Sequence, residues 1–183
     1  MMHHFPKSVC LVLTATLTTV LSISSLAYQN EPYEFRGIAW GTPITELLNM
    51  VPVLQGADLT AYTREGDKMR IGNAELNKIH YIFYKGEFYC VHVGFEGLSN
   101  FDALTEIFIR EYGRPPERQY TDRHYHWEGD GTSISLDYDA STEKGEIGYK
   151  YMPIQRLVDQ EEKNAAKNDA ARAEEEEEPG LRQ

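Results

Sequence analysis

The chain has 183 residues, a pI near 5.0 and a formal net charge of −11 at pH 7. A chain this acidic, without a cluster of Lys or Arg residues, is a poor candidate for binding nucleic acid or an anionic lipid surface. Its two cysteines are Cys10 and Cys90.

The N-terminal segment has the features of a secretory signal peptide. Lys7 precedes an apolar run over residues 9–21, and the small residues Ser25 and Ala27 provide a cleavage site. The apolar run is shorter than the ~20 residues that a membrane-spanning helix needs. We therefore expect residues 1–27 to be a signal peptide cleaved before Tyr28, and not an uncleaved anchor. This predicts export, to a bacterial periplasm or to the medium, with no membrane span in the mature chain.

The mature chain divides into one domain and an acidic tail. Cleavage removes one base, Lys7, and no acid, so the mature net charge becomes −12. Cys90 is then the only cysteine, which excludes an intramolecular disulfide. Residues 28–158 are long enough for a single domain with its own core. Residues 159–183 contain nine acids, four bases and few large apolar side chains, so we expect a solvated helix or disordered tail.

The first part of the domain predicts a strand, a helix and two more strands. Residues 34–38 resemble a strand, and Thr42 followed by Pro43 is typical of a helix start. Four apolar residues follow at the i, i+3, i+4 and i+7 spacing of an amphipathic helix: Ile44, Leu47, Leu48 and Val51. Pro52 would end this helix, and short strands are predicted over residues 59–65 and 68–72.

Residues 79–97 are the densest aromatic and β-branched run of the domain, interrupted by Lys85-Gly86. They predict a β-hairpin with two alternative registers. A two-residue loop would place Ile79, Tyr81 and Phe83 on one face with Phe88, Cys90 and His92. A three-residue loop with a left-handed glycine would shift the register by one, and group them with Tyr89, Val91, Val93 and Phe95. We prefer the second register because it gives a more apolar core face.

The second part predicts one helix and three strands. Ser99 is the expected N-cap, with Asp102 in the first turn. Phe101, Leu104, Phe108 and Tyr112 then form one apolar stripe, and Gly113 ends the helix. Strands are predicted over residues 119–127, 133–138 and 146–151. The predicted fold is therefore α+β, with an antiparallel sheet packed on two amphipathic helices and an acidic C-terminal helix or tail.

Two segments of the chain match each other at a constant offset of 60 residues. F-R-G-I-A-W-G-T-P-I-T-E-L begins at Phe35, and F-E-G-L-S-N-F-D-A-L-T-E-I begins at Phe95. Each segment is expected to end a strand, turn on a glycine and start a helix. The match predicts a tandem strand–helix–sheet repeat, and the alternative is two junctions with similar local requirements.

Histidines are the residues with the clearest capacity for metal chemistry. In the preferred register His80 lies opposite His92 on the outward face, with Cys90 two residues away. Imidazole pairs near a thiolate suit Zn²⁺ or Cu²⁺. His124 and His126 share another strand face, and the sequence does not say whether the two pairs meet. The alternative is that all of these are ordinary polar residues of a solvated sheet face.

Tyrosine is abundant, with twelve residues in the chain. Tyr62, Tyr84 and Tyr120 fall on predicted strands outside the core stripe, so they are candidates for a binding face. The alternative is that tyrosine is simply a good strand former. No nucleophile elbow, zinc-protease motif, P-loop or dinucleotide fingerprint occurs. We therefore predict no catalytic residue and no cofactor.

The F-R-G-I-A-W-G-T, Y-K-G-E-F-Y and F-E-G-L-S-N-F segments resemble a group of uncharacterised bacterial exported proteins, over roughly Phe35 to Tyr138. The resemblance implies a periplasmic or secreted setting, and it supplies no catalytic residues. The predicted function is a non-enzymatic exported domain that binds a protein or another ligand of the cell envelope. The alternative function is periplasmic binding of Zn²⁺ or Cu²⁺ through His80, His92 and Cys90.

Overall fold

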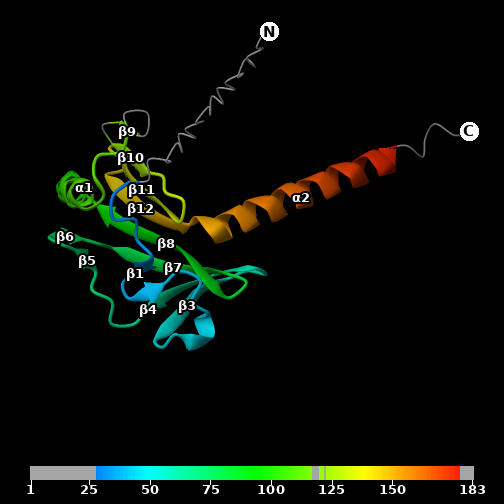
Figure 1. The fold of residues 1–183 in the computed structure, drawn as a ribbon, viewed down its shortest axis with the longest axis horizontal. Coiled ribbons are helices and arrows are strands. Elements are labelled where there is room, and N and C mark those ends of the chain that lie inside the picture. The colour runs from blue at the N-terminus through cyan, green and yellow to red at the C-terminus, as the bar shows by residue number, and fades with distance from the viewer. Residues whose placement is uncertain (1–27, 117–119, 122, 178–183) are drawn as a thin grey trace, which may run out of the picture.

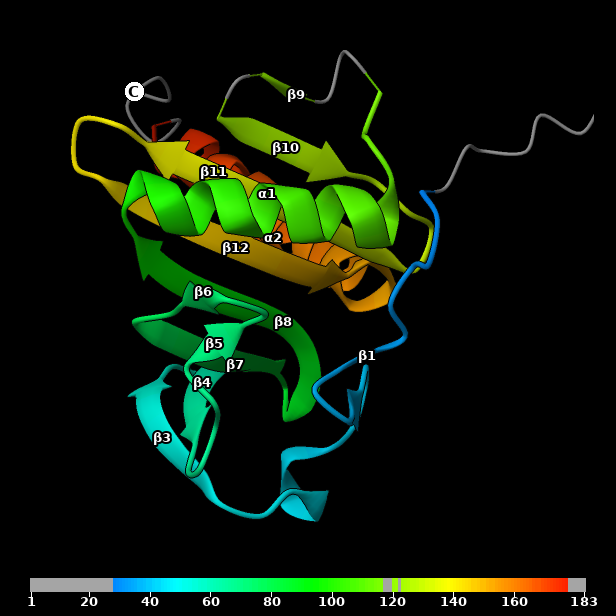
Figure 2. The same cartoon turned by 90° about the vertical axis from the view of Figure 1, so that its left-hand side faces the viewer.

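The computed structural model describes residues 28–116, 120–121 and 123–177. Their fold is α+β, with an eight-stranded antiparallel sheet, helix α1 (Leu98–Tyr112) on one face and helix α2 (Met152–Glu177) on the other (Figures 1 and 2). The predicted signal peptide, residues 1–27, lies outside the described residues. Within the described ranges, no helix combines the length and the apolar character needed to cross a bilayer.

The large sheet has the strand order β3-β4-β7-β8-β12-β11-β10-β9. Its strands are β3 (Met50–Gln55), β4 (Leu59–Arg64), β7 (Lys78–Tyr84), β8 (Glu87–Glu96), β9 (Tyr120–Thr121), β10 (His124–Trp127), β11 (Thr132–Asp139) and β12 (Lys144–Tyr151). Two small hairpins flank it, β1 (Glu34–Phe35) with β2 (Ile38–Ala39), and β5 (Arg70–Ile71) with β6 (Ala74–Glu75). The sheet thus consists of two halves that are each continuous in sequence order, and they meet where β8 pairs with β12.

The β7–β8 hairpin combines features of both predicted registers. Lys85 and Gly86 have φ values of 49° and 86°, which is a two-residue turn, so the predicted three-residue loop is wrong. A bulge at Tyr89 then shifts the register by one, because Phe83 pairs with Phe88 while Ile82 pairs with Cys90. The predicted pairing of His80 with His92 is confirmed.

Because of this bulge, the core face of β8 differs from the predicted one. Phe88 and Val91 are both fully buried in the main core. Tyr89 was predicted to face that core, but it packs with Tyr84 and Cys90 in a second, smaller cluster. The extra residue places two consecutive side chains, Tyr89 and Cys90, on the same face, while Phe88 and Val91 face the main core.

Helix α1 lies where the sequence predicted it, and Phe101, Leu104 and Phe108 are its buried residues. The predicted N-cap is wrong, because the cap position is Gly97, at φ 86°, and not Ser99. Asn100 orders the junction instead: its side chain donates to the carbonyl of Glu96 at 2.8 Å and accepts the backbone N–H of Glu75 at 3.0 Å. This links the helix start to β6 and to the end of β8.

The helix predicted over residues 43–51 does not form. Only a single 3₁₀ turn, η1 (Ile44–Glu46), occurs there, and β3 begins at Met50. Apart from the bonds of this turn, the backbone of the segment bonds to the β7–β8 hairpin: the N–H of Gly41 donates to Phe88 at 2.7 Å, and that of Ile44 donates to Gly86 at 2.9 Å. Pairing with a preformed hairpin therefore overrides a short amphipathic pattern.

The two segments of the predicted repeat differ in structure. Phe35 leads into a tight turn, with Arg36 at φ 51° and Gly37 at φ 78°, which joins β1 to β2. Phe95 instead continues β8 and leads into α1. The structure therefore does not confirm a duplication, and only α1 of the two predicted amphipathic helices packs on the sheet.

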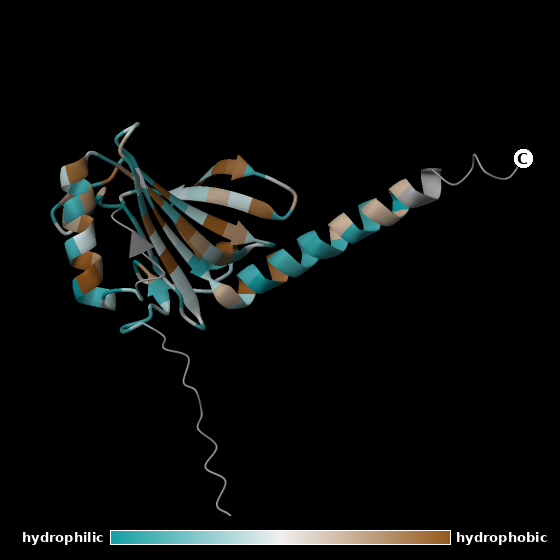
Figure 3. Ribbon diagram, turned by 90° about the horizontal axis from the view of Figure 1, so that it is seen from above, coloured by the Kyte–Doolittle hydropathy of each residue, from teal (hydrophilic) through white to brown (hydrophobic). Residues whose placement is uncertain are grey.

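Helix α2 is the second helix that packs on the sheet, and it covers the face opposite α1. Ile154 and Val158 pack against Tyr84, Tyr89 and Cys90. Beyond these first turns the helix is exposed and extends away from the body, in hydrophilic colours over most of its length (Figures 1 and 3). It begins at Met152, inside the predicted domain, and continues without a break to Glu177, within the predicted tail.

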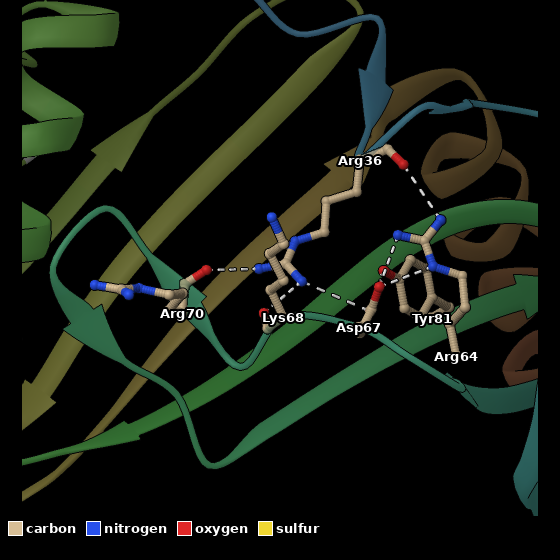
Figure 4. Close-up of polar contacts among 6 residues, drawn as sticks. All are labelled: Arg36, Arg64, Asp67, Lys68, Arg70 and Tyr81. Atoms are coloured by element: carbon tan, nitrogen blue, oxygen red, sulfur yellow. Dashed lines mark hydrogen bonds and ion pairs between the residues drawn. The ribbon is translucent and has the colours of Figure 1, made fainter.

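A buried ionic cluster fixes the end of β4 (Figure 4). The Asp67 carboxylate, 8% exposed, accepts bonds from Arg64 Nε at 2.8 Å and from the Tyr81 hydroxyl at 2.5 Å, and Arg36 lies 3.7 Å away. Arg36 also donates to the carbonyls of Lys68 and Arg70. Burial, followed by the bond to Asp67, raises the pKa of Tyr81, so the hydroxyl remains a donor. These groups partner one another, which is typical of a structural cluster.

Gly145 gives a test of how β8 and β12 pack. It pairs with Phe95, whose ring covers it, and a Cβ at position 145 would overlap that ring. We expect Gly145→Ala to lower the free energy of unfolding by about 1–3 kcal/mol in urea denaturation, because the ring would have to leave its place in the core.

Gly148→Ala on the same strand is the matched control. Its Cβ would meet only the Ser135 hydroxyl, at 2.9 Å, and that side chain can rotate. Combining Gly145→Ala with Phe95→Leu should make the loss smaller than the sum of the two single losses. A Gly145→Ala protein as stable as the wild type would show that the ring does not occupy this position.

Candidate functional site

Among the residues that the structure describes, the most unusual surface is the outer strand, β3, which pairs with another described strand on one side only. Its side chains are Met-Val-Pro-Val-Leu-Gln, with no charge. Val51, Val53 and Leu54 are 40%, 47% and 63% exposed, and Leu48 just before the strand is 81% exposed. Natural sheets usually protect such an edge with charges, so an uncharged apolar edge marks a candidate binding surface.

The backbone of β3 also has groups available at the free edge. Two bonds bracket its pairing with β4: the N–H of Glu65 donates to Asn49 at 2.9 Å, and that of Gly56 donates to Leu59 at 2.8 Å. Asn49 and Gly56 thus face β4, so the next residues inward, Met50 and Gln55, direct their N–H groups to the free edge. Both ends of the strand can do so because a register shift lies between Pro52 and Leu54. Pro52 also takes an outward position, where its missing N–H breaks no bond to β4. We call this surface the β3 edge.

A groove adjoins the β3 edge where the β3–β4 turn approaches helix α2. It has a volume of about 400 Å³. Apolar atoms come from Leu59, Tyr84, Val158 and Ala165, and carboxylates from Asp58, Glu161 and Glu162. We call it the α2 groove.

Glu161 holds the helix over the hairpin at the α2 groove. Its carboxylate accepts the Tyr84 hydroxyl at 2.5 Å and the Lys85 ammonium at 2.7 and 2.8 Å. These contacts lie within the segment that the sequence assigned to a solvated tail. The tail therefore supplies one wall of the groove.

A second cavity, of about 330 Å³, is lined by aromatic residues. Trp40 stacks on Phe88, with ring centroids 4.9 Å apart, and Tyr151 lies beyond it. Glu31 lies at its margin and accepts the backbone N–H groups of Gly131, at 2.6 Å, and of Thr132. This carboxylate ties the N-terminal lead to the β10–β11 turn, which is a structural task.

Three of the four predicted histidines lie in one row of paired residues across five strands, in the order His80, His92, Gly148, Ser135, His126. His124 pairs with Asp137, outside this row. His80 and His92 are neighbours, but His126 is three strands from His92, about 14 Å at the usual strand spacing. The two histidine pairs therefore do not meet. His92 lies 3.0 Å from Glu146, and His124 lies 2.9 Å from Asp137.

Cys90 is poorly suited to complete a metal site. Its side chain is buried under α2, and burial raises the pKa of its thiol to about 11. The thiolate that binds metal is therefore disfavoured at neutral pH. In the part of the chain that the structure describes, no three His, Cys, Asp or Glu side chains are grouped to hold a metal ion. Metal binding by His80 and His92 remains a prediction.

The three predicted binding tyrosines do not gather on one surface. Tyr62 packs edge-on against Phe83 on the main core face, with ring centroids 5.3 Å apart. Tyr84 is buried on the opposite face beneath α2. Tyr120 lies in β9, but its side chain is outside the described part of the structure. Sequence reasoning missed the β3 edge because its apolar residues matched a helical spacing.

The His80 position predicts a pH dependence of stability. Partial burial, followed by the nearby charges of Lys78 and His92, lowers the pKa of His80. The unfolded chain then binds more protons than the folded one below the ordinary pKa of 6.5, so stability falls as the pH falls through that value. We expect a lower melting temperature at pH 5.5 than at pH 7.5, and a smaller decrease in His80→Gln.

His126→Gln, which removes a histidine from the same face three strands from His92, is the control. It should leave the His80 contribution in place. A His80→Gln protein whose melting temperature changes with pH as much as the wild type would contradict the prediction.

Comparison of the chain with protein-family models, curated proteins and solved structures finds no match. The assignment of function therefore rests on the geometry of the β3 edge and the α2 groove.

Proposed function

We propose that the chain is an exported, non-enzymatic interaction domain that binds an extended segment of a partner protein along the β3 edge. The observation that supports this most directly is the uncharged, apolar and unpaired β3. In strand addition the backbone groups of an exposed edge provide affinity, and the alternate side chains provide specificity. The N–H groups of Met50 and Gln55, with Val51, Val53 and Leu54 beside them, supply both.

The other edge of the sheet supports the choice of β3. In the described ranges its last strand, β9, has two residues, and a very short edge strand is a common protection against pairing. β3 has six residues and retains two protective devices, the proline at position 52 and a register shift between Pro52 and Leu54. An edge with this partial protection suits pairing with a selected segment more than indiscriminate aggregation.

The alternative, a periplasmic metal-binding protein, has one favourable observation, the confirmed pairing of His80 with His92. Two imidazoles are too few for a structural site of four ligands. The buried Cys90 thiol lies in the hydrophobic cluster below α2 and is not an available third ligand. We therefore favour the interaction domain.

A peptide probe tests the proposal. The probe is an extended peptide of alternating Val and Thr that ends in Leu-Gln-Gln, which favours strand formation and carries no charged side chain. On binding, it should slow amide hydrogen exchange at Met50 and Gln55, whose N–H groups face the free edge. The Val53→Lys/Leu54→Lys double variant should bind it about tenfold more weakly, because charges on an edge oppose pairing.

The matched control is Leu98→Lys/Met69→Lys, which adds the same charge at apolar residues that are 48% and 43% exposed and lie outside β3. It should bind the probe as the wild type does. Equal loss of binding in both variants, or a probe that leaves the Met50 and Gln55 amides unprotected, would contradict strand addition at this edge.

A further inference from the structure

We infer that the partner segment is basic at one end, and that its Lys or Arg side chains enter the α2 groove while its apolar part pairs with the β3 edge. This rests on the proposed function and specifies the chemistry of the partner. Three observations support it: the charge of the groove, its continuity with β3, and the poor fit of a second copy of the chain.

The α2 groove has an excess of negative charge beside apolar atoms. Asp58, Glu161 and Glu162 supply three carboxylates. The nearest cation, Lys85, is held by Glu161 at 2.7 Å, so it neutralises one of the three. A Lys or Arg side chain has an apolar stem and a charged head, which matches apolar walls formed by Leu59 and Val158 below an acidic rim.

The arrangement of charges on α2 makes the groove side selectively acidic. Val158, Glu161, Glu162 and Ala165 recur at the spacing that places them on one face of a helix, and all four line the groove. Lys163 and Lys167 fall on the opposite side by the same geometry. These two lysines therefore do not neutralise the groove.

The groove lies directly beyond the end of β3. The strand ends at Gln55, and the next residues, Gly56, Ala57 and Asp58, already line the groove. A segment paired along β3 and continued past Gln55 would therefore come close to Asp58, one of the groove carboxylates. The apolar edge and the acidic groove form one surface that fits an apolar run ending in basic residues.

A second copy of the chain is a poorer occupant. Its own edge strand contains no basic residue, and the groove it would bring carries the same acids. Each copy also has a net charge of −11, so long-range repulsion opposes its approach. Electrostatic complementarity therefore favours a different, basic partner.

The test compares the neutral probe with a twin that ends in Leu-Arg-Arg in place of Leu-Gln-Gln. Each is made with its Leu-containing end at either terminus, so that both strand directions are sampled. The wild-type chain should bind the basic twin about fivefold more tightly than the neutral one in at least one direction, as expected for two partly exposed ion pairs. This preference should shrink between about 0.05 M and about 0.5 M NaCl.

The variant Asp58→Lys/Glu162→Lys reverses the groove charge and leaves the Glu161 contacts in place. It should remove the preference for the basic twin but still bind the neutral probe. Glu106→Lys/Glu111→Lys makes the same charge change on exposed positions of α1 and should keep the preference.

The outcomes separate the two proposals. If the neutral probe binds and the basic twin binds no better, the basic partner is excluded and the interaction domain stands. If neither peptide binds in either direction, the β3 edge is not a strand-addition site. If both charge-reversed variants lose the preference equally, the net charge of the chain, and not the groove, selects the peptide.

Discussion

The bulge at Tyr89 is the local constraint on which the rest of the arrangement depends. It sends Phe88 to the main core and sends Tyr89 and Cys90 to the smaller cluster. β8 can therefore be buried on both faces near its start, in the middle of the sheet. The first cluster receives α1, and the second receives the first turns of α2. Without the extra residue, Tyr89 and Cys90 could not both face α2, and the apolar cluster beneath its first turns would be smaller.

The β3 edge depends on contacts far from the strand itself. Arg64 ends β4, pairs with Met50 and holds the buried carboxylate of Asp67. The preceding segment is held by backbone bonds to the β7–β8 hairpin. A strand with no buried residue of its own is thus kept in place by a buried ionic cluster on one side and by a hairpin on the other. This lets its apolar side chains stay exposed, because they are not needed for the core.

The sequence predicted most of the fold, and the failures have physical causes. Regular alternation over β11 and β12 and the α1 stripe, from Phe101 to Phe108, located these elements because each pattern was long and had one interpretation. The single strand predicted over residues 119–127 is wrong, because β9 and β10 are two strands that pair with each other. Ile44, Leu47, Leu48 and Val51 matched a helix over only two turns, too few to outweigh pairing with the hairpin. The candidate site was beyond sequence reasoning, since a free edge and a groove depend on strand order and on where α2 packs.

The pairing of β8 with β12 has a consequence for how the chain folds. Every other pair in the sheet joins a strand to the next sheet strand of the same half. The β8–β12 pair joins the two halves, and residues 97–143 separate Glu96 at the end of β8 from Lys144 at the start of β12. Closing that long loop carries the largest entropic cost of any pairing in the sheet. Two locally formed halves, joined late along one seam, are therefore the expected folding route, and the rate should be governed by this seam.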